Sequence, residues 1–104
     1  MLSHEVTLVR IYLREAEYLL GKVINYLHDE AKVSGVTVLR GVEGFSDDGK
    51  VRTVSLMNLS LDLPLVIEFY DETEKAKAIV AKLVGEMHLP HVISFPVTHY
   101  RREA

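Results

Sequence analysis

The chain contains four segments rich in β-branched residues and two segments with helical periodicity, and their order restricts the folds it can adopt. Residues 5–14, 36–40, 65–70 and 92–100 are dominated by Val, Ile, Thr, Leu and aromatic residues, which favours strands. Residues 20–31 and 76–87 carry apolar side chains at three- and four-residue steps, which favours amphipathic helices. The order βαββαβ predicts an α+β fold, a ferredoxin-like sandwich whose antiparallel sheet carries both helices on one face.

The positions of the strands within this sheet follow from one proline. Pro96 lies inside the last strand segment and has no N–H to donate to a neighbouring strand, so we expect residues 92–100 at a sheet edge. The ferredoxin-like order then places residues 5–14 and 65–70 in the centre and residues 36–40 at the other edge.

Both predicted helices carry a boundary signal. Gly35 stands where the first helix is expected to end, and glycine is the usual residue at a helix C-terminus. Asp71 stands three residues before Glu74, a spacing typical of a capping box at the start of the second helix. We therefore expect Gly35 and Asp71 to delimit the two helices.

Alternation along the strands predicts two different sheet faces. The face expected under the helices carries Thr7, Val9, Ile11, Leu13, Thr37, Leu39, Leu65, Ile67, Phe69, Ile93, Phe95 and Val97. The opposite face carries Val6, Leu8, Tyr12, Val36, Val38, Val42 and Val66 around Arg10, Arg40 and Glu68. That face is too apolar for solvent and too charged for a monomer core, which predicts self-association, with Arg10 and Glu68 able to neutralise one another.

The connection between the second and third strand segments is unusually long. Residues 45–63 fill it, about nineteen residues where compact domains commonly use two to six. One interpretation is an extra edge hairpin, with residues 51–57 as a projecting strand, and the other is a functional loop. Because residues 46–58 offer few core contacts, we expect them to be mobile without ligand.

The root of this loop combines a cation with two glycines in the segment 40–45, Arg-Gly-Val-Glu-Gly-Phe. Exposed backbone N–H groups beside an arginine suit an anion, and further cations are available from Lys22 and Arg52. The glycines alternatively only end a strand, and Arg40 is alternatively a structural partner of Glu68. Two hypotheses therefore stand for this root, a ligand site and a structural turn.

Composition excludes several classes of function. The chain has 104 residues, which indicates one domain, and it has no cysteine, which excludes disulfides and thiolate chemistry. Among the five histidines only His88 and His91 are close in sequence, on a loop broken by proline, so we expect no native metal site. No catalytic motif is present, the net charge of −3 disfavours nucleic acid, and no apolar run reaches the ~20 residues of a membrane span. We expect a non-enzymatic protein of the cytoplasm.

Three segments of the chain, taken together, resemble those of a known family. They are Gly21-Lys22, SGVTVLRGVEGF over residues 34–45, and LSLDLPLVIE over residues 59–68. In this order and spacing they resemble the PII-like family catalogued as Domain of Unknown Function 190, and the resemblance covers nearly the whole chain. It implies a single PII-like domain over residues 1–104, a homotrimer, and a long loop at the position of the PII T-loop.

The resemblance also implies a function. PII proteins are signal integrators that bind adenine nucleotides in clefts between subunits, and the corresponding positions here are residues 40–45, 87–91 and 100–102. The implied function is non-enzymatic signalling or ligand sensing, with an adenine nucleotide or another small anion as ligand and a protein target reached through residues 46–58. The expected ligand-binding residues are Lys22, Arg40, Gly41, Gly44, Phe45, Arg52, His88, Tyr100 and Arg101.

Two alternatives remain. A structural or metal-tolerance trimer of the CutA type has the same architecture without a nucleotide. RNA-binding RRM domains share the βαββαβ order, but their aromatic sheet motif is missing from residues 65–70.

Overall fold

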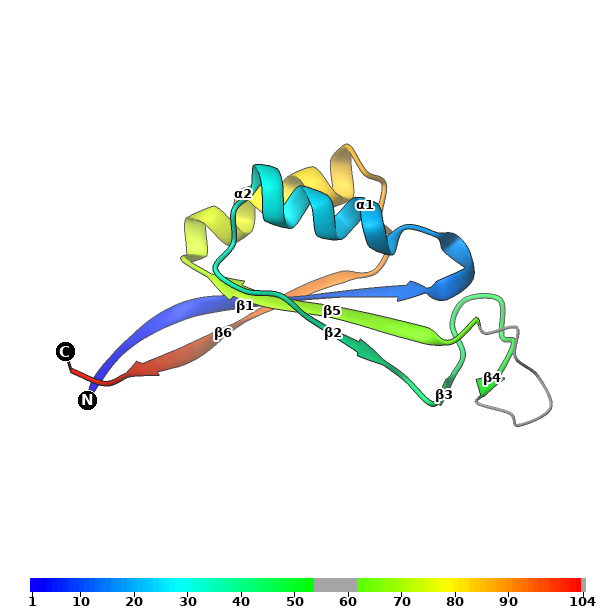
Figure 1. The fold of residues 1–104 in the computed structure, drawn as a ribbon, viewed down its shortest axis with the longest axis horizontal. Coiled ribbons are helices and arrows are strands. Elements are labelled where there is room, and N and C mark those ends of the chain that lie inside the picture. The colour runs from blue at the N-terminus through cyan, green and yellow to red at the C-terminus, as the bar shows by residue number, and fades with distance from the viewer. Residues whose placement is uncertain (54–61, 104) are drawn as a thin grey trace.

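A four-stranded antiparallel sheet carries two helical segments on one of its faces (Figure 1). The computed structural model describes residues 1–53 and 62–103. The strands are β1 (Leu2–Arg14), β2 (Thr37–Arg40), β5 (Pro64–Asp71) and β6 (Val92–Arg101), in the order β2-β5-β1-β6. The expected α+β fold is confirmed, with β1 and β5 in the centre and Pro96 on the edge strand β6.

The helices bury the apolar side of the central strands. The first helix is α1 (Leu20–Asn25), which continues as a wider turn, η2 (Tyr26–Glu30), and the second is α2 (Thr73–Gly85). The buried core joins Val9, Ile11, Leu13, Leu65, Ile67 and Phe69 of the sheet with Val23, Leu27, Ala76, Ile79 and Leu83 of the helices. Each buried Val, Leu, Ile or Phe side chain contributes roughly 1.5–3 kcal/mol, so this layer holds the helices to the sheet.

The first helix ends earlier than Gly35. Lys32 takes the left-handed backbone conformation, with φ 53°, and the Val33 N–H donates to the Leu27 carbonyl at 3.1 Å. The second helix ends in the same way: His88 has φ 56° and the Leu89 N–H donates to Leu83 at 3.1 Å. The expected glycine cap is therefore wrong, because a lysine reverses the chain three residues before the glycine.

The start of α2 also differs from the expectation. Its N-cap is Glu72, which makes no side-chain capping bond. Asp71 is the last residue of β5, where its carboxylate accepts the Glu72 N–H at 2.8 Å and pairs with Lys75 at 3.1 Å. The expected Asp71–Glu74 capping box is wrong because Asp71 lies one residue too early in the chain.

Strand register corrects the predicted faces of the two edge strands. Val38 pairs with Ile67 and Arg40 with Leu65, so the helix-covered side of β2 carries Val38 and Arg40. In β6, Ile93 pairs with Arg10, which places it on the opposite side. The edge-strand residues expected under the helices but found on the uncovered face are Thr37, Leu39, Ile93, Phe95 and Val97. Alternation within one strand does not define which face is buried, and a one-residue shift exchanges the faces.

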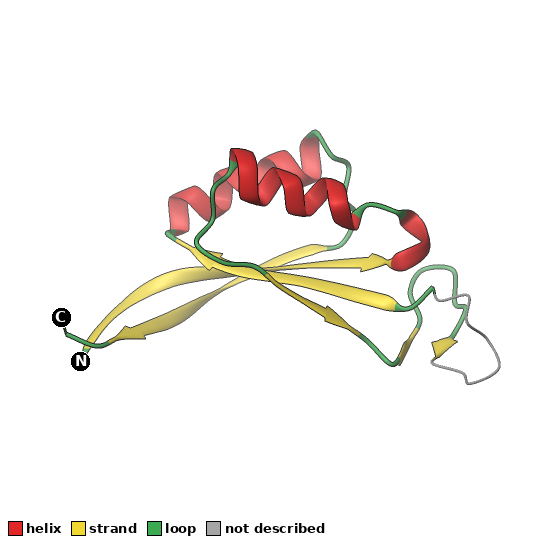
Figure 2. Ribbon diagram, in the orientation of Figure 1, coloured by secondary structure: helices red, strands yellow, loops and turns green. Residues whose placement is uncertain are grey.

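No described segment covers the second side of the sheet, which we call the open face (Figure 2). At its centre the Arg10 Nε donates to Glu68 at 2.8 Å, which confirms the expected neutralisation. Arg10 also lies over the Phe95 ring, 5.5 Å from its centroid. The exposed apolar side chains around this pair are Tyr12, Leu39, Tyr70, Ile93 and Phe95.

The long loop begins as a short hairpin. Its strands β3 (Glu43–Gly44) and β4 (Arg52–Thr53) pair antiparallel, at the end of the molecule opposite the two termini (Figure 1). The projecting strand expected over residues 51–57 is described only as far as residue 53, and its remainder lies outside the described residues. The mobility expected for residues 46–58 stays a prediction: residues 46–53 are described, and residues 54–58 lie outside the described residues. No helix in the described ranges is long and apolar enough to cross a membrane.

Candidate ligand-binding site

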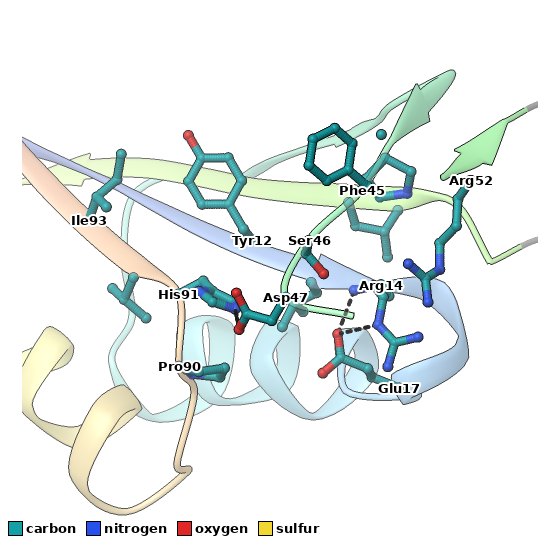
Figure 3. Close-up of a pocket in the computed structure, with 15 residues that line it drawn as sticks. Tyr12, Arg14, Glu17, Phe45, Ser46, Asp47, Arg52, Pro90, His91 and Ile93 are labelled. Atoms are coloured by element: carbon teal, nitrogen blue, oxygen red, sulfur yellow. Dashed lines mark hydrogen bonds and ion pairs between the residues drawn. The ribbon is translucent and has the colours of Figure 1, made fainter. Parts of the chain in front are cut away.

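A cavity of about 470 Å³ lies where the end of β1, the root of the long loop and the segment after α2 meet (Figure 3). Its apolar lining includes Tyr12 from β1, Phe45 from the loop, Pro64 from β5 and Ile93 from β6. Tyr12 is 39% exposed and Phe45 is 73% exposed. The cavity therefore presents two aromatic side chains to solvent above an apolar floor.

Two glycines let the loop root approach β5. A Cβ on Gly41 would lie 2.7 Å from the Pro64 Cγ, and one on Gly44 would lie 3.2 Å from it. The Gly41 N–H donates to the Pro64 carbonyl at 2.8 Å. Close packing against Pro64 thus explains Gly41 here, and its N–H is not available to an anion.

Ion pairs connect the loop to the end of β1. Arg52 donates to Asp62 at 2.7 Å and to Asp48 at 2.5 Å, and Asp62 also accepts from Arg14 at 3.0 Å. Arg14 lies 3.7 Å from Glu17 on its other side (Figure 3). This chain of five charged groups ties three parts of the loop, at residues 48, 52 and 62, to one strand end.

The same ion pairs shift the pKa values of their members. Hydrogen bonds from Arg52 and from the Lys50 N–H hold the pKa of Asp48 far below its usual value of 3.8. Hydrogen bonding to Asp48 and then Asp62 raises the pKa of Arg52. Partial desolvation acts to raise the pKa of Asp62, but bonds from the Ala16 N–H and Arg52 outweigh it and lower that pKa. All three groups are therefore charged at neutral pH.

A further contact joins the loop to the segment after α2. The Asp47 carboxylate lies 3.0 Å from His91 Nε2, across the mouth of the cavity (Figure 3). His91 follows Pro90 and lines the cavity together with it. Asp47 thus joins the loop to the segment after α2, whereas Asp48 contacts Arg52 within the loop.

The structure brings only some of the expected ligand residues together. Gly44, Phe45 and Arg52 line the cavity, and Gly41 packs beside it on Pro64. Arg40 is ion-paired with Glu15. It does not pair with Glu68, because the two side chains belong to opposite faces of the sheet, so that structural hypothesis was wrong in its partner.

The other four expected residues lie elsewhere. Lys22 is exposed in a separate polar groove between the helices, together with Lys82. His88 is exposed at the end of α2 and is not among the residues that line the cavity. Tyr100 and Arg101 are at the far end of β6, beside the N-terminus (Figure 1).

Several site residues were not singled out from the sequence. Tyr12 and Arg14 look like ordinary strand residues, and nothing in their spacing indicates a cavity. Asp62 belongs to the LSLDLPLVIE segment that carried the family resemblance, and that segment was the available signal. In residues 1–53 and 62–103, no three His, Asp or Glu side chains group as a metal site would require.

Comparison with known proteins decides the family. The model of DUF190, described as "Uncharacterized ACR, COG1993", matches residues 6–98. The chain belongs to the DUF190 family. This DUF190 chain is 35% identical over 83 residues to a UPF0166 protein of Aquifex aeolicus, covering 76% of this chain and 79% of the relative. It is 32% identical over 81 residues to the UPF0166 protein MJ1524 of Methanocaldococcus jannaschii, covering 73% of each.

Two solved structures of a PII-like protein have the same fold. CPII of Thiomonas intermedia K12, a nitrogen regulatory PII-like protein bound to ADP, AMP and bicarbonate, aligns with TM-score 0.67 at 13% identity, covering 98% of this chain and 100% of that one. Its apo form aligns with TM-score 0.67 at 18% identity, covering 97% and 98%. The expected membership of the DUF190 family is confirmed, and the expected resemblance to PII-like proteins is confirmed for the fold.

Proposed function

We propose that this DUF190 protein is a non-enzymatic PII-like ligand sensor, a single-domain chain that forms a homotrimer and binds an adenine nucleotide in the cavity at the loop root. The observation that carries the proposal is the cavity itself, in which exposed aromatic rings and apolar walls lie beside arginines. The fold it shares with a protein bound to ADP and AMP supports the same ligand class.

The nucleobase is assigned to the apolar part of the cavity. Tyr12 and Phe45 present partly exposed rings, and Pro64 and Ile93 supply aliphatic surface. Stacking on an aromatic side chain contributes about 1–3 kcal/mol per base and tolerates different bases. The adenine ring is therefore expected against Phe45, the more exposed of the two rings.

The phosphates are assigned to the cationic rim. Arg14 and Arg52 lie on the loop side of the cavity, and a guanidinium binds a phosphate through two parallel hydrogen bonds. Arg40 and Gly44 are at the same loop root. Lys22 and His88 lie outside the cavity of the isolated chain and stay in the proposal on the strength of the family resemblance.

Tyr100 and Arg101 are assigned to a neighbouring subunit's site. Both lie at the end of the sheet opposite the cavity, so a contact with ligand requires a second chain. The open face supports such an assembly, because its apolar side chains surround a neutralised ion pair. In the trimer the loop over residues 46–58 is proposed to contact a protein target.

Calorimetry with AMP, ADP and ATP tests the function. The wild-type protein is expected to bind at least one of them, and Phe45→Ala is expected to weaken binding about fivefold to 150-fold, the equivalent of ~1–3 kcal/mol. Val84→Ala, an exposed position on α2, is the matched control and should bind like wild type. Absence of heat with every nucleotide would retire the proposal in favour of a CutA-type trimer without nucleotide. Unchanged affinity in Phe45→Ala would retire the stacking assignment alone.

A further inference from the structure

Two adjacent carboxylates of the long loop contact two different basic side chains at the cavity. The turn over residues 46–49, closed by a 2.8 Å bond from the Gly49 N–H to the Ser46 carbonyl, presents them. Asp47 contacts His91 at 3.0 Å, and Asp48 contacts the Arg52 Nη2 and Nη1 atoms at 2.5 and 3.1 Å. We call these two contacts, Asp47–His91 and Asp48–Arg52, the carboxylate lock.

Arg52 has little capacity left for a ligand in this arrangement. Its side chain is only 12% exposed. Its Nε donates to Asp62, its Nη1 to Asp48 and the Lys50 carbonyl, and its Nη2 to Asp48. A phosphate can therefore form two parallel hydrogen bonds with this guanidinium only if a carboxylate leaves it, and Asp48 is the partner that comes from the loop turn.

The charges around the cavity also indicate that carboxylates have to leave before an anion binds. Arg14, Arg52 and His91 are contacted by four carboxylates, those of Glu17, Asp47, Asp48 and Asp62. This excess of negative charge repels an anion. With Asp47 and Asp48 removed, Arg14 and Arg52 are balanced by Glu17 and Asp62, and His91 has no carboxylate at its Nε2. The balance of charge therefore favours an anion in that second arrangement.

We propose that Asp48, assisted by Asp47, acts as an internal competitor for the ligand's anionic group, so that a nucleotide phosphate binds by displacing the carboxylate lock and thereby releases the turn at residues 46–49. The inference rests on the proposed function, because it concerns the same cavity and ligand class. It adds a route by which occupancy changes the loop: a ligand that replaces Asp48 at Arg52 removes a contact that holds the turn to β4.

The two contacts of the carboxylate lock differ in how strongly they compete with a ligand. Asp47 is 84% exposed, and exposed ion pairs are weak, whereas Arg52 is largely buried and donates twice to Asp48. Asp48 is therefore the main competitor and Asp47 the auxiliary one. Replacing Asp48 alone should produce most of the effect of replacing both.

The test compares Asp47→Asn/Asp48→Asn with the control Asp29→Asn/Glu74→Gln, which removes the same charge from exposed helical positions. Hydrogen exchange of the ligand-free proteins should show residues 46–53 exchanging at least about tenfold faster in the lock variant only. Calorimetry should show ADP binding about tenfold tighter to the lock variant. Adenosine, which has the base without the charge, should bind equally to the lock variant, the control and wild type.

Each outcome bears on one proposal. Equal exchange of residues 46–53 in the lock variant and wild type overturns the lock, whatever the nucleotide does. ADP binding that is unchanged or weaker in the lock variant also overturns it, and so does an equal gain for adenosine, because charge competition predicts a gain for ADP alone. Absence of ADP, AMP and ATP binding in all three proteins overturns the proposed function, while the exchange data still decide whether the carboxylates hold the turn.

Discussion

The two faces of the sheet share the same central strands but differ in what they contact. On the helix-covered face Val9, Ile11 and Ile67 are fully buried among other apolar side chains. On the open face Arg10 and Glu68 form an ion pair within a ring of half-exposed apolar residues. A closed core excludes such charges because their desolvation is costly, whereas a surface that joins two folded chains tolerates them when they are paired. The difference supports the proposed assembly through the open face and is the reason to test it.

The largest expected effect is the loss of assembly in Val66→Asp. Val66 lies on the open face of the central strand β5, where an aspartate would be an unpaired charge inside the proposed interface. We expect light scattering at micromolar concentration to give this variant a molar mass near the 11.8 kDa of one chain. Val84→Asp on the helix surface should keep the assembled mass, and if wild type itself has the mass of one chain the proposed trimer is wrong.

Phe69→Ala tests the covered face. Phe69 is among the largest fully packed side chains of the core, and truncating a buried phenylalanine lowers the free energy of unfolding by about 3–5 kcal/mol. The neighbour Tyr70 points to the open face and is half exposed, so Tyr70→Ala should cost less. Urea denaturation at one fixed chain concentration measures both. Equal losses would show that the two faces are packed alike.

Arg10→Met sharpens the difference between the faces. The substitution leaves Glu68 without its partner, so in an assembled protein it should lower the melting temperature clearly more than Lys77→Met, an exposed control on α2. The double variant Arg10→Met/Glu68→Met should recover most of that loss, because no charge is then left unpaired. If Arg10→Met has the same melting temperature as Lys77→Met, the Arg10–Glu68 pair remains exposed to solvent.

The smallest effect is expected from Thr7→Val at the margin of the covered face. Among the described residues Thr7 is the buried polar side chain, and its Oγ1 donates to the Thr73 Oγ1 at 3.0 Å. Removing one such hydrogen bond costs about 1 kcal/mol. Thermal unfolding of Thr7→Val, Thr73→Val and the double variant checks this, since the two single losses should not add if the bond is the cause.

Much of the fold was predictable from local patterns. The apolar alternation of residues 5–14 and 65–70 identified the central strands and their buried face, because both strands are covered over most of their length. The edge strands were assigned to the wrong faces, because Leu39 and Ile93 are as apolar as core residues although half of each is exposed. Their facing depends on register, a property of two strands together.

The candidate site was predictable in outline only. The glycines and Phe45 marked the loop root, but Gly41 is explained by Pro64, which is distant in sequence. Arg52 was expected to hold an anion and already holds Asp48 and Asp62. Arg14 and Asp62 join the site through a contact between segments far apart in the chain, which residue spacing does not reveal. His91 belongs to the segment 87–91 that the family resemblance had indicated.

The sequence by itself determined the element order, the central and edge strands, the family, and the place where the long loop leaves the sheet. Those properties depend on residue types and their periodicity within short segments, so they can be inferred without the tertiary contacts. The pairing of Arg10 with Glu68 was also predictable, because both residues lie on the same face of neighbouring central strands. Only the tertiary structure decided the other partners, Glu15 for Arg40 and the loop carboxylates for Arg52. A charge takes the partner that register and loop packing bring within a few ångströms, and that distance is set by the whole fold.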